Sequence, residues 1–63
     1  MKINSKKIRQ ELEWAGMTVK DLADKLVMTD RAIEYILEKE TTKLKTITKI
    51  GKVLAVDPKD LLI

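Results

Sequence analysis

Hydrophobic residues recur at helical spacing over the first quarter of the chain. They are Ile8, Leu12 and Ala15. Intervals of four and three positions place side chains on one face of an α-helix, which can bury that face in a domain core. Asn4 or Ser5 can cap the first turn, and Gly16 is a natural end because glycine adopts the left-handed conformation readily. The pattern predicts a first helix over about residues 5–15.

Two shorter apolar stripes follow almost without a break. The first consists of Leu22, Ala23 and Leu26, and the second consists of Ile33, Ile36 and Leu37. Each set fills one face of a helix. The connection between the two predicted helices is only Val27 and Met28. So short a joint forces the helix axes to cross steeply, which is typical of a helix-turn-helix.

Start signals precede both of these helices. Thr18 and Asp21 have the pattern of a capping box, in which the threonine oxygen accepts from a free backbone N–H and the carboxylate accepts from the amide of the capping residue. Thr29 caps the next helix in the same way. Asp30 lies in its first turn, where the helix dipole favours an anion. This next helix is predicted over about residues 30–38.

The last third of the chain carries a longer apolar stripe and a further start signal. The stripe follows a polar loop over residues 39–43 and consists of Leu44, Ile47, Ile50, Gly51, Val53 and Leu54. Its spacing is typical of a buried helix. Asp57 as cap, Pro58 at the first helical position and Asp60 completing a second capping box predict a short last helix. Because no segment alternates as a strand would, the sequence predicts one all-α domain of five helices over residues 1–63.

The composition excludes several classes of function. The chain has no cysteine and no histidine, so it lacks the usual zinc ligands, the thiol nucleophile and the commonest general base. We therefore expect neither an enzyme nor a protein that holds a metal, a cofactor or a small-molecule ligand. No apolar run approaches the roughly 20 residues of a membrane span, and no signal peptide follows the lysine-rich start. We expect a cytoplasmic protein without a membrane partner.

The net charge of +3 suits a polyanionic partner, but the charge is unevenly placed. Basic side chains exceed acidic ones in residues 1–17 and 40–52, whereas residues 18–39 hold four basic and five acidic side chains. Three of these acids recur every four residues in one predicted helix; they are Asp30, Glu34 and Glu38. If the chain binds DNA, attraction to phosphate must come mainly from the flanking segments.

The motifs occur in a fixed order along the chain. The order is Gly16-Met17-Thr18, Leu22-Ala23, Thr29, Ile33, Ile36, the polar loop, Leu44, Ile47, Ile50, Leu54, Val56 and Leu61. Over nearly the whole chain this order resembles the Xre/Cro group of phage and bacterial repressors. The resemblance implies a five-helix, lambda-repressor-like domain that binds double-stranded DNA as a homodimer on a two-fold operator.

The chain departs from that family at four positions. Val19 stands where a glutamine commonly holds a phosphate, which leaves Thr18 and backbone amides for that contact. Val27 stands at the turn glycine, and a left-handed conformation costs such a residue roughly 1–2 kcal/mol, so we expect the turn to differ in detail. Lys39 replaces a glycine that often ends the third helix. Leu37 occupies a commonly polar position and is either core or part of a contact surface.

The resemblance also implies which residues face bases. They are the outward residues of the third helix, Asp30, Arg31, Glu34 and Tyr35. Arg31 is the strongest candidate because a guanidinium can bridge O6 and N7 of guanine. The acids can accept from cytosine N4, and the tyrosine can reach a phosphate or a thymine methyl. Alternatively, Arg31 pairs with Glu34 or stacks on Tyr35, and Asp30 serves only the helix dipole.

Phosphate contacts are expected mainly at helix starts. The candidates are Thr18, Thr29, Thr41, Thr42, Lys43 and Lys45. Such contacts use free backbone amides and short polar or basic side chains, whereas the alternative is a solvated loop with a helix cap. Three cations of the first helix either hold a neighbouring phosphate or balance nearby acids; they are Lys6, Lys7 and Arg9.

Two functions remain open at this point. The first is a repressor-like transcriptional regulator that reads an operator as a homodimer. The second is an interaction module derived from a helix-turn-helix, antitoxin-like or anti-repressor, whose partner would explain the acidic row. The first candidate for a dimer surface is the apolar end Leu61-Leu62-Ile63. We expect Trp14 to lie flat on that end, with a dimer contact as the alternative.

Overall fold

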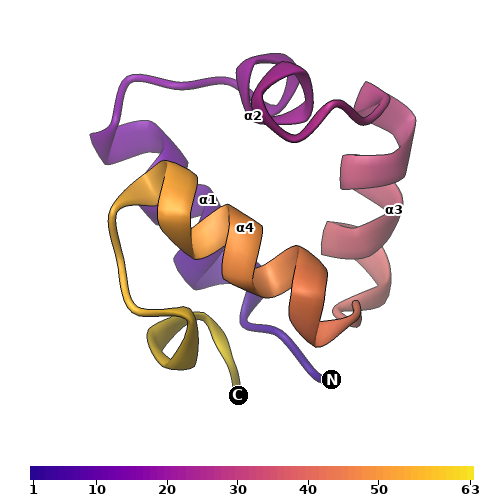
Figure 1. Cartoon of the computed structure of the whole chain (residues 1–63), viewed down its shortest axis with the longest axis vertical. Coiled ribbons are helices and arrows are strands. Elements are labelled where there is room, and N and C mark those ends of the chain that lie inside the picture. Colours follow the sequence, from indigo (N-terminus) through magenta and orange to yellow (C-terminus); the bar gives the residue numbers. More distant parts are fainter.

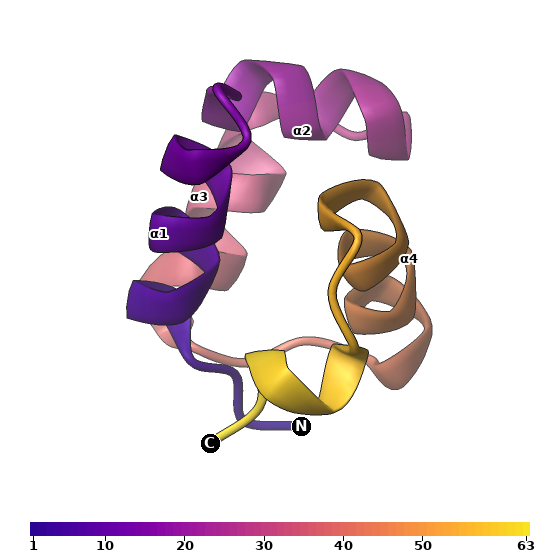
Figure 2. The ribbon, with the colours of Figure 1, turned by 90° about the vertical axis from the view of Figure 1, so that its left-hand side faces the viewer.

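Four α-helices and one 3-10 turn make up the computed structural model, which describes all residues from 1 to 63 (Figure 1). The elements are α1 (Ser5–Trp14), α2 (Val19–Leu26), α3 (Asp30–Lys39), α4 (Leu44–Leu54) and the turn η1 (Pro58–Leu61). Helices α1 and α4 lie on opposite sides of the molecule, and α2 closes one end between them (Figure 2). The predicted all-α class and the first four helices are confirmed.

The predicted fifth helix is a single 3-10 turn. Asp57 caps it, but its carboxylate accepts from the backbone N–H of Lys59, at 3.0 Å. The amide of Asp60 donates to the backbone carbonyl of Asp57 at 2.9 Å, and no capping box forms. At Leu62 the backbone is already extended. The segment is therefore too short to form an α-helical nucleus, and bonds from residue i to i−3 close a tight turn instead.

One cluster of 13 buried hydrophobic residues forms the core, and every element contributes to it. Its members are Ile3, Ile8, Leu12, Leu22, Ala23, Leu26, Ile33, Ile36, Leu37, Ile47, Ile50, Leu54 and Leu61. Leu37 is therefore core rather than contact surface. Two residues of the predicted stripes are exposed: Leu44, the first residue of α4, is 57% exposed, and Ala15 is exposed because it follows the end of α1 as its cap.

The start of α1 is fixed by two adjacent polar residues with different tasks. The Asn4 side chain accepts from the backbone N–H of Lys7 at 3.1 Å and is the helix cap. The Ser5 hydroxyl is buried and donates to the carbonyl of Leu37 in α3. A buried hydroxyl needs such a partner. Asn4 therefore caps α1, while Ser5 joins α1 to α3.

The segment before α1 pairs with two distant parts of the chain. Isolated β-bridges join Lys2 with Thr41 and Ile3 with Leu62. The amide of Ile3 donates to the carbonyl of Glu40 at 2.9 Å, and the Ile3 side chain is fully buried. Both chain ends therefore lie beside the α3–α4 loop (Figure 2). The hydrophobic pattern carried no strand signal here because each bridge joins a single pair of residues.

The turn between α2 and α3 keeps the left-handed conformation although it holds no glycine. Val27 has φ 56° and ψ 48°. The amide of Met28 donates to the carbonyl of Ala23 at 2.8 Å and so closes the helix end. Val27 thus takes the left-handed conformation itself, and this bond and the packing of both helices hold its backbone there. Helix α3 also ends left-handed, at Glu40 rather than at Lys39.

Trp14 does not lie on the C-terminal residues, contrary to expectation. Its side chain is 69% exposed. Trp14 ends α1 at the side next to α2, whereas the C-terminus lies beside the start of α1 (Figure 2). Leu61 is fully buried within the domain, whereas Ile63 is 74% exposed. Only part of the expected dimer surface is therefore accessible.

Candidate nucleic-acid interface

Helix α3 lies along one edge of the molecule (Figure 1). Its buried residues are Ile33, Ile36 and Leu37. The four residues expected to face bases are all exposed: Asp30, Arg31, Glu34 and Tyr35. Asp30 and Glu34 are four residues apart, as are Arg31 and Tyr35, so the two pairs form adjacent rows on the helix surface. The structure therefore brings the predicted base-reading residues together on the solvent side of α3.

Arg31 has no charged or aromatic partner within the chain. The only ion pair of the structure lies on α1, so Arg31 does not pair with Glu34. The ring of Tyr35 is approached by Lys39 instead, whose Nζ lies 5.9 Å from the ring centroid. The guanidinium is therefore free for a bidentate contact. The i, i+4 spacing of Tyr35 and Lys39 was the sequence signal for this missed pair.

The start of α2 is capped by its own carboxylate and threonine. The Thr18 hydroxyl oxygen accepts from the backbone N–H of Asp21 at 3.1 Å, and the Asp21 carboxylate accepts from the amide of Thr18 at 2.9 Å. The backbone hydrogen bond from Thr18, followed by the side-chain hydrogen bond, holds the pKa of Asp21 below its ordinary value. A fixed negative charge therefore lies at this helix start, and the backbone amides of Val19 and Lys20, which have no acceptor in the chain, are the donors left for a phosphate.

The start of α3 is capped without an acid reaching back. The Thr29 hydroxyl oxygen accepts from the backbone N–H of Ala32 at 3.1 Å. The backbone amides of the next two residues, Asp30 and Arg31, have no acceptor in the chain. Both amides point along the helix dipole and can donate to a phosphate. The Asp30 side chain is exposed in this first turn and is the local charge that opposes such a contact.

The start of α4 is open and basic. Its cap residue Lys43 makes no side-chain capping bond. The first three backbone amides of the helix have no acceptor in the chain; they belong to Leu44, Lys45 and Thr46. Lys43 and Lys45 are exposed beside them. Free amides and two lysines at a helix N-terminus form a suitable arrangement for an anion.

The two threonines before α4 differ in what they can still donate. The amide of Thr42 already donates to the carbonyl of Met1 at 3.1 Å. Only its hydroxyl remains for a phosphate. Thr41 is exposed, and its β-bridge to Lys2 uses the backbone of its neighbours. The N-terminal segment thus positions the loop that carries these two candidates.

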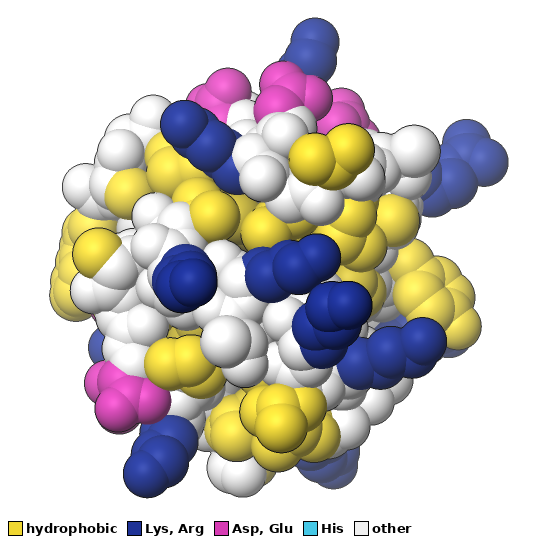
Figure 3. All heavy atoms as spheres, viewed as in Figure 1, with side chains coloured by type: hydrophobic (Ala, Val, Ile, Leu, Met, Phe, Trp, Pro, Cys, Tyr) yellow, Lys and Arg dark blue, Asp and Glu magenta, His cyan; other side chains and the backbone are white.

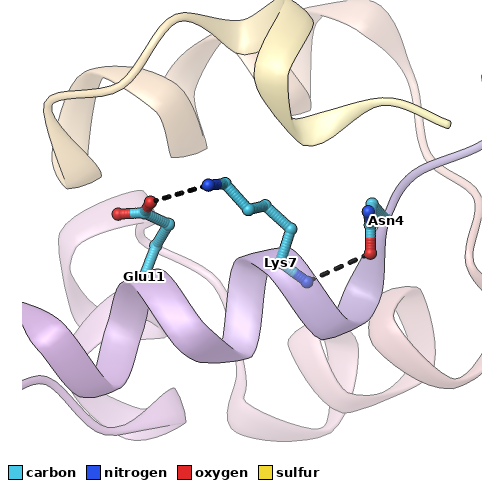
Figure 4. Close-up of polar contacts among 3 residues, drawn as sticks. All are labelled: Asn4, Lys7 and Glu11. Atoms are coloured by element: carbon cyan, nitrogen blue, oxygen red, sulfur yellow. Dashed lines mark hydrogen bonds and ion pairs between the residues drawn. The ribbon is translucent and has the colours of Figure 1, made fainter.

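One of the three cations of α1 is engaged within the helix. Lys7 Nζ lies 3.4 Å from Glu11 Oε1, and Figure 4 shows the two side chains side by side. The same Nζ lies 5.9 Å from the centroid of the Trp14 ring. Lys7 therefore balances an acid rather than standing free, whereas Lys6 and Arg9 are exposed and form no ion pair.

Comparison with known families decides what this arrangement is. A helix-turn-helix family, HTH_3, matches residues 8–61. The chain belongs to the Xre/Cro-type helix-turn-helix family. No curated protein and no solved structure matches it. Membership implies a DNA-binding regulator and a typically non-enzymatic domain. None of the helices in this helix-turn-helix protein has the length and apolar character that crossing a membrane requires.

Proposed function

We propose that this helix-turn-helix protein is a sequence-specific, repressor-like transcriptional regulator that places α3 in the major groove of its operator. The observation that carries the proposal is the free guanidinium of Arg31 on the exposed side of α3. The open start of α3 belongs to the helix that carries Arg31, and the open start of α4 belongs to the next helix. Arg31 would read a guanine, while the two helix starts would hold backbone phosphates.

The regulator acts as a homodimer on DNA in this proposal. One domain of this size reads few base pairs, which does not select one site among genomic competitors. Two copies related by a two-fold axis would read half-sites roughly 10–10.5 bp apart or a multiple of that spacing. The exposed Ile63 and the accessible part of Leu62 are the apolar residues at the C-terminal end available for such a contact.

Selection from a random DNA pool by the purified protein tests both parts. An enriched inverted repeat is expected, and sedimentation with that DNA should show two proteins for each duplex. Recovery of unrelated sequences would overturn sequence-specific reading. A single protein that saturates on one half-site, with no gain from the second, would overturn the dimer.

One observation favours a second function. The acidic row Asp30, Glu34 and Glu38 is exposed and forms no ion pair, so it would repel phosphate along α3. An interaction module whose partner carries a basic surface would use this row instead. Binding to random DNA at two salt concentrations separates the two functions: affinity that falls steeply with salt supports the regulator, and no binding at either concentration supports the module.

A further inference from the structure

A groove lies between the C-terminal end of α2 and the side of α4. Its volume is about 250 Å³, and it is open to solvent. Six residues line it: Lys25, Leu26, Val27, Lys49, Lys52 and Val53. None of them is among the residues assigned above to bases or phosphates. Figure 3 shows basic side chains around hydrophobic atoms over this part of the surface. The groove is therefore a feature separate from the DNA interface.

The fold gives no reason for an apolar, β-branched residue at position 27 of the groove. Val27 has a left-handed backbone, with φ 56°, a conformation that β-branched residues adopt at a cost and glycine adopts freely. Its side chain is 91% exposed and so contributes almost nothing to the core. Within this chain a glycine would therefore be favoured. An apolar side chain kept in a strained, exposed place points to a contact outside the chain.

The charged side chains that line the groove all have one sign. Lys25, Lys49 and Lys52 are exposed, and none of them forms an ion pair. No acidic residue lines the groove. The apolar part, made of Leu26, Val27 and Val53, thus lies among three free ammonium groups. A fitting ligand carries carboxylates around an apolar side chain.

We propose that this groove binds an acidic segment of another protein, with one apolar side chain packed between Val27 and Val53 and carboxylates on the three lysines. A second copy of this chain does not fit, because two-fold pairing of this face would bring lysines against lysines. A nucleic acid would use the lysines and leave the apolar part uncovered. Since α3 remains free, the regulator could hold DNA and this partner together.

A defined peptide tests the proposal. The isotope-labelled protein is titrated with a short synthetic peptide of glutamates and leucines, and binding is followed by the backbone NMR signals of the groove residues. Two companion peptides replace the glutamates by glutamine or the leucines by serine. We expect the signals of Lys25, Val27 and Val53 to shift, and either replacement to weaken binding at least about fivefold. Equal binding of all three peptides would overturn the proposal.

Paired variants assign the binding to this groove. Lys49→Gln with Lys52→Gln should weaken peptide binding by about tenfold at low salt, because two of the three lysines that would bind the peptide carboxylates are lost. The matched control, Lys6→Gln with Lys59→Gln, removes the same charge from exposed positions elsewhere and should leave binding unchanged. Equal weakening by both pairs would mean attraction by net charge alone and would overturn the groove.

Val27→Gly separates docking from folding. Relief of the left-handed strain should raise the melting temperature, while loss of the apolar contact should weaken peptide binding. A variant with raised stability and undiminished binding would contradict the role of Val27. A random-sequence DNA duplex serves as the last probe: if it shifts the groove signals as strongly as the acidic peptide does, the groove is a phosphate surface and the proposal is wrong.

Discussion

The starts of α2 and α4 both present backbone amides, but only the start of α2 has side chains that accept from them. At α2, the Thr18 hydroxyl accepts from the amide of Asp21, and the Asp21 carboxylate accepts from the amide of Thr18 and places a negative charge at the helix start. At α4, Lys43 offers no capping side chain, and the first three amides remain unpaired beside two exposed lysines. A helix start can thus be filled for stability or left open for a ligand. The comparison predicts that changes at α2 alter mainly stability and changes at α4 alter mainly DNA binding.

The largest effect on DNA binding is expected for a change in α3, the helix that lies between α2 and α4 in the chain. Arg31→Ala should cost about 1–3 kcal/mol on the preferred operator and relax the preference at one base pair. Fluorescence polarisation with operator and random duplexes measures both. Arg9→Ala, on α1, is the matched control and should leave base preference intact. If Arg31→Ala weakens both duplexes equally, Arg31 contacts a phosphate and does not read a base.

The open start of α4 should respond next most strongly. Lys43→Ala should weaken binding to every sequence by about tenfold and lower the salt slope by about one, because one fewer counterion is released. Its melting temperature should not change, since Lys43 makes no capping bond. Lys59→Ala removes an exposed lysine from η1 for comparison. An unchanged salt slope for Lys43→Ala would remove α4 from the interface.

A change at the capped start of α2 should lower stability and strengthen DNA binding, whereas the change at α4 weakens DNA binding and leaves stability unchanged. Asp21→Asn removes the carboxylate that accepts from Thr18, so the melting temperature should fall. The same change removes a negative charge near the expected phosphate, so affinity for random DNA should rise about two- to threefold. Calorimetry and polarisation on one preparation give both values. Weaker DNA binding by the folded variant would show that this helix start does not repel DNA.

The pH dependence of stability sharpens the same contrast. The pKa of Asp21 lies below its ordinary value of 3.8 in the folded protein. Its stabilising contribution is therefore fully present above about pH 4 and is lost as the pH falls through the lower, folded value. The difference in melting temperature between the original protein and Asp21→Asn should exist at neutral pH and shrink in strong acid. A difference that stays constant down to acid pH would contradict the capping role of the charge.

The smallest effect is expected at the end of the acidic row. Glu38→Gln should strengthen binding to any DNA by about twofold, because repulsion from the backbone is relieved without loss of a base contact. Glu13→Gln on α1 is the control for net charge. Glu34→Gln with Glu38→Gln decides between the two functions. Tighter and still salt-sensitive DNA binding supports the regulator, and the absence of binding before and after the change supports the interaction module.

Local patterns predicted most of the fold and the exposed positions of the residues proposed to face bases. Capping threonines and apolar stripes placed α2 and α3 because these signals act within one or two turns of a helix. Predictions were less successful where distant segments meet. Ile3 preceded every predicted helix yet is fully buried, and Trp14 ends α1 away from the residues it was expected to cover. Neither outcome depends on neighbours in the sequence, so periodicity carried no signal for it.

The sequence by itself determined the helix-turn-helix, the capping box at Thr18 and the residues on the outer side of α3. Those features depend on contacts within a few positions, which residue order specifies directly. Tertiary structure alone decided that Ile3 is buried, that Trp14 is exposed, and that Val27 joins α4 residues in one groove. The physical reason is that such features depend on how packed helices approach one another, and packing is a property of the whole core.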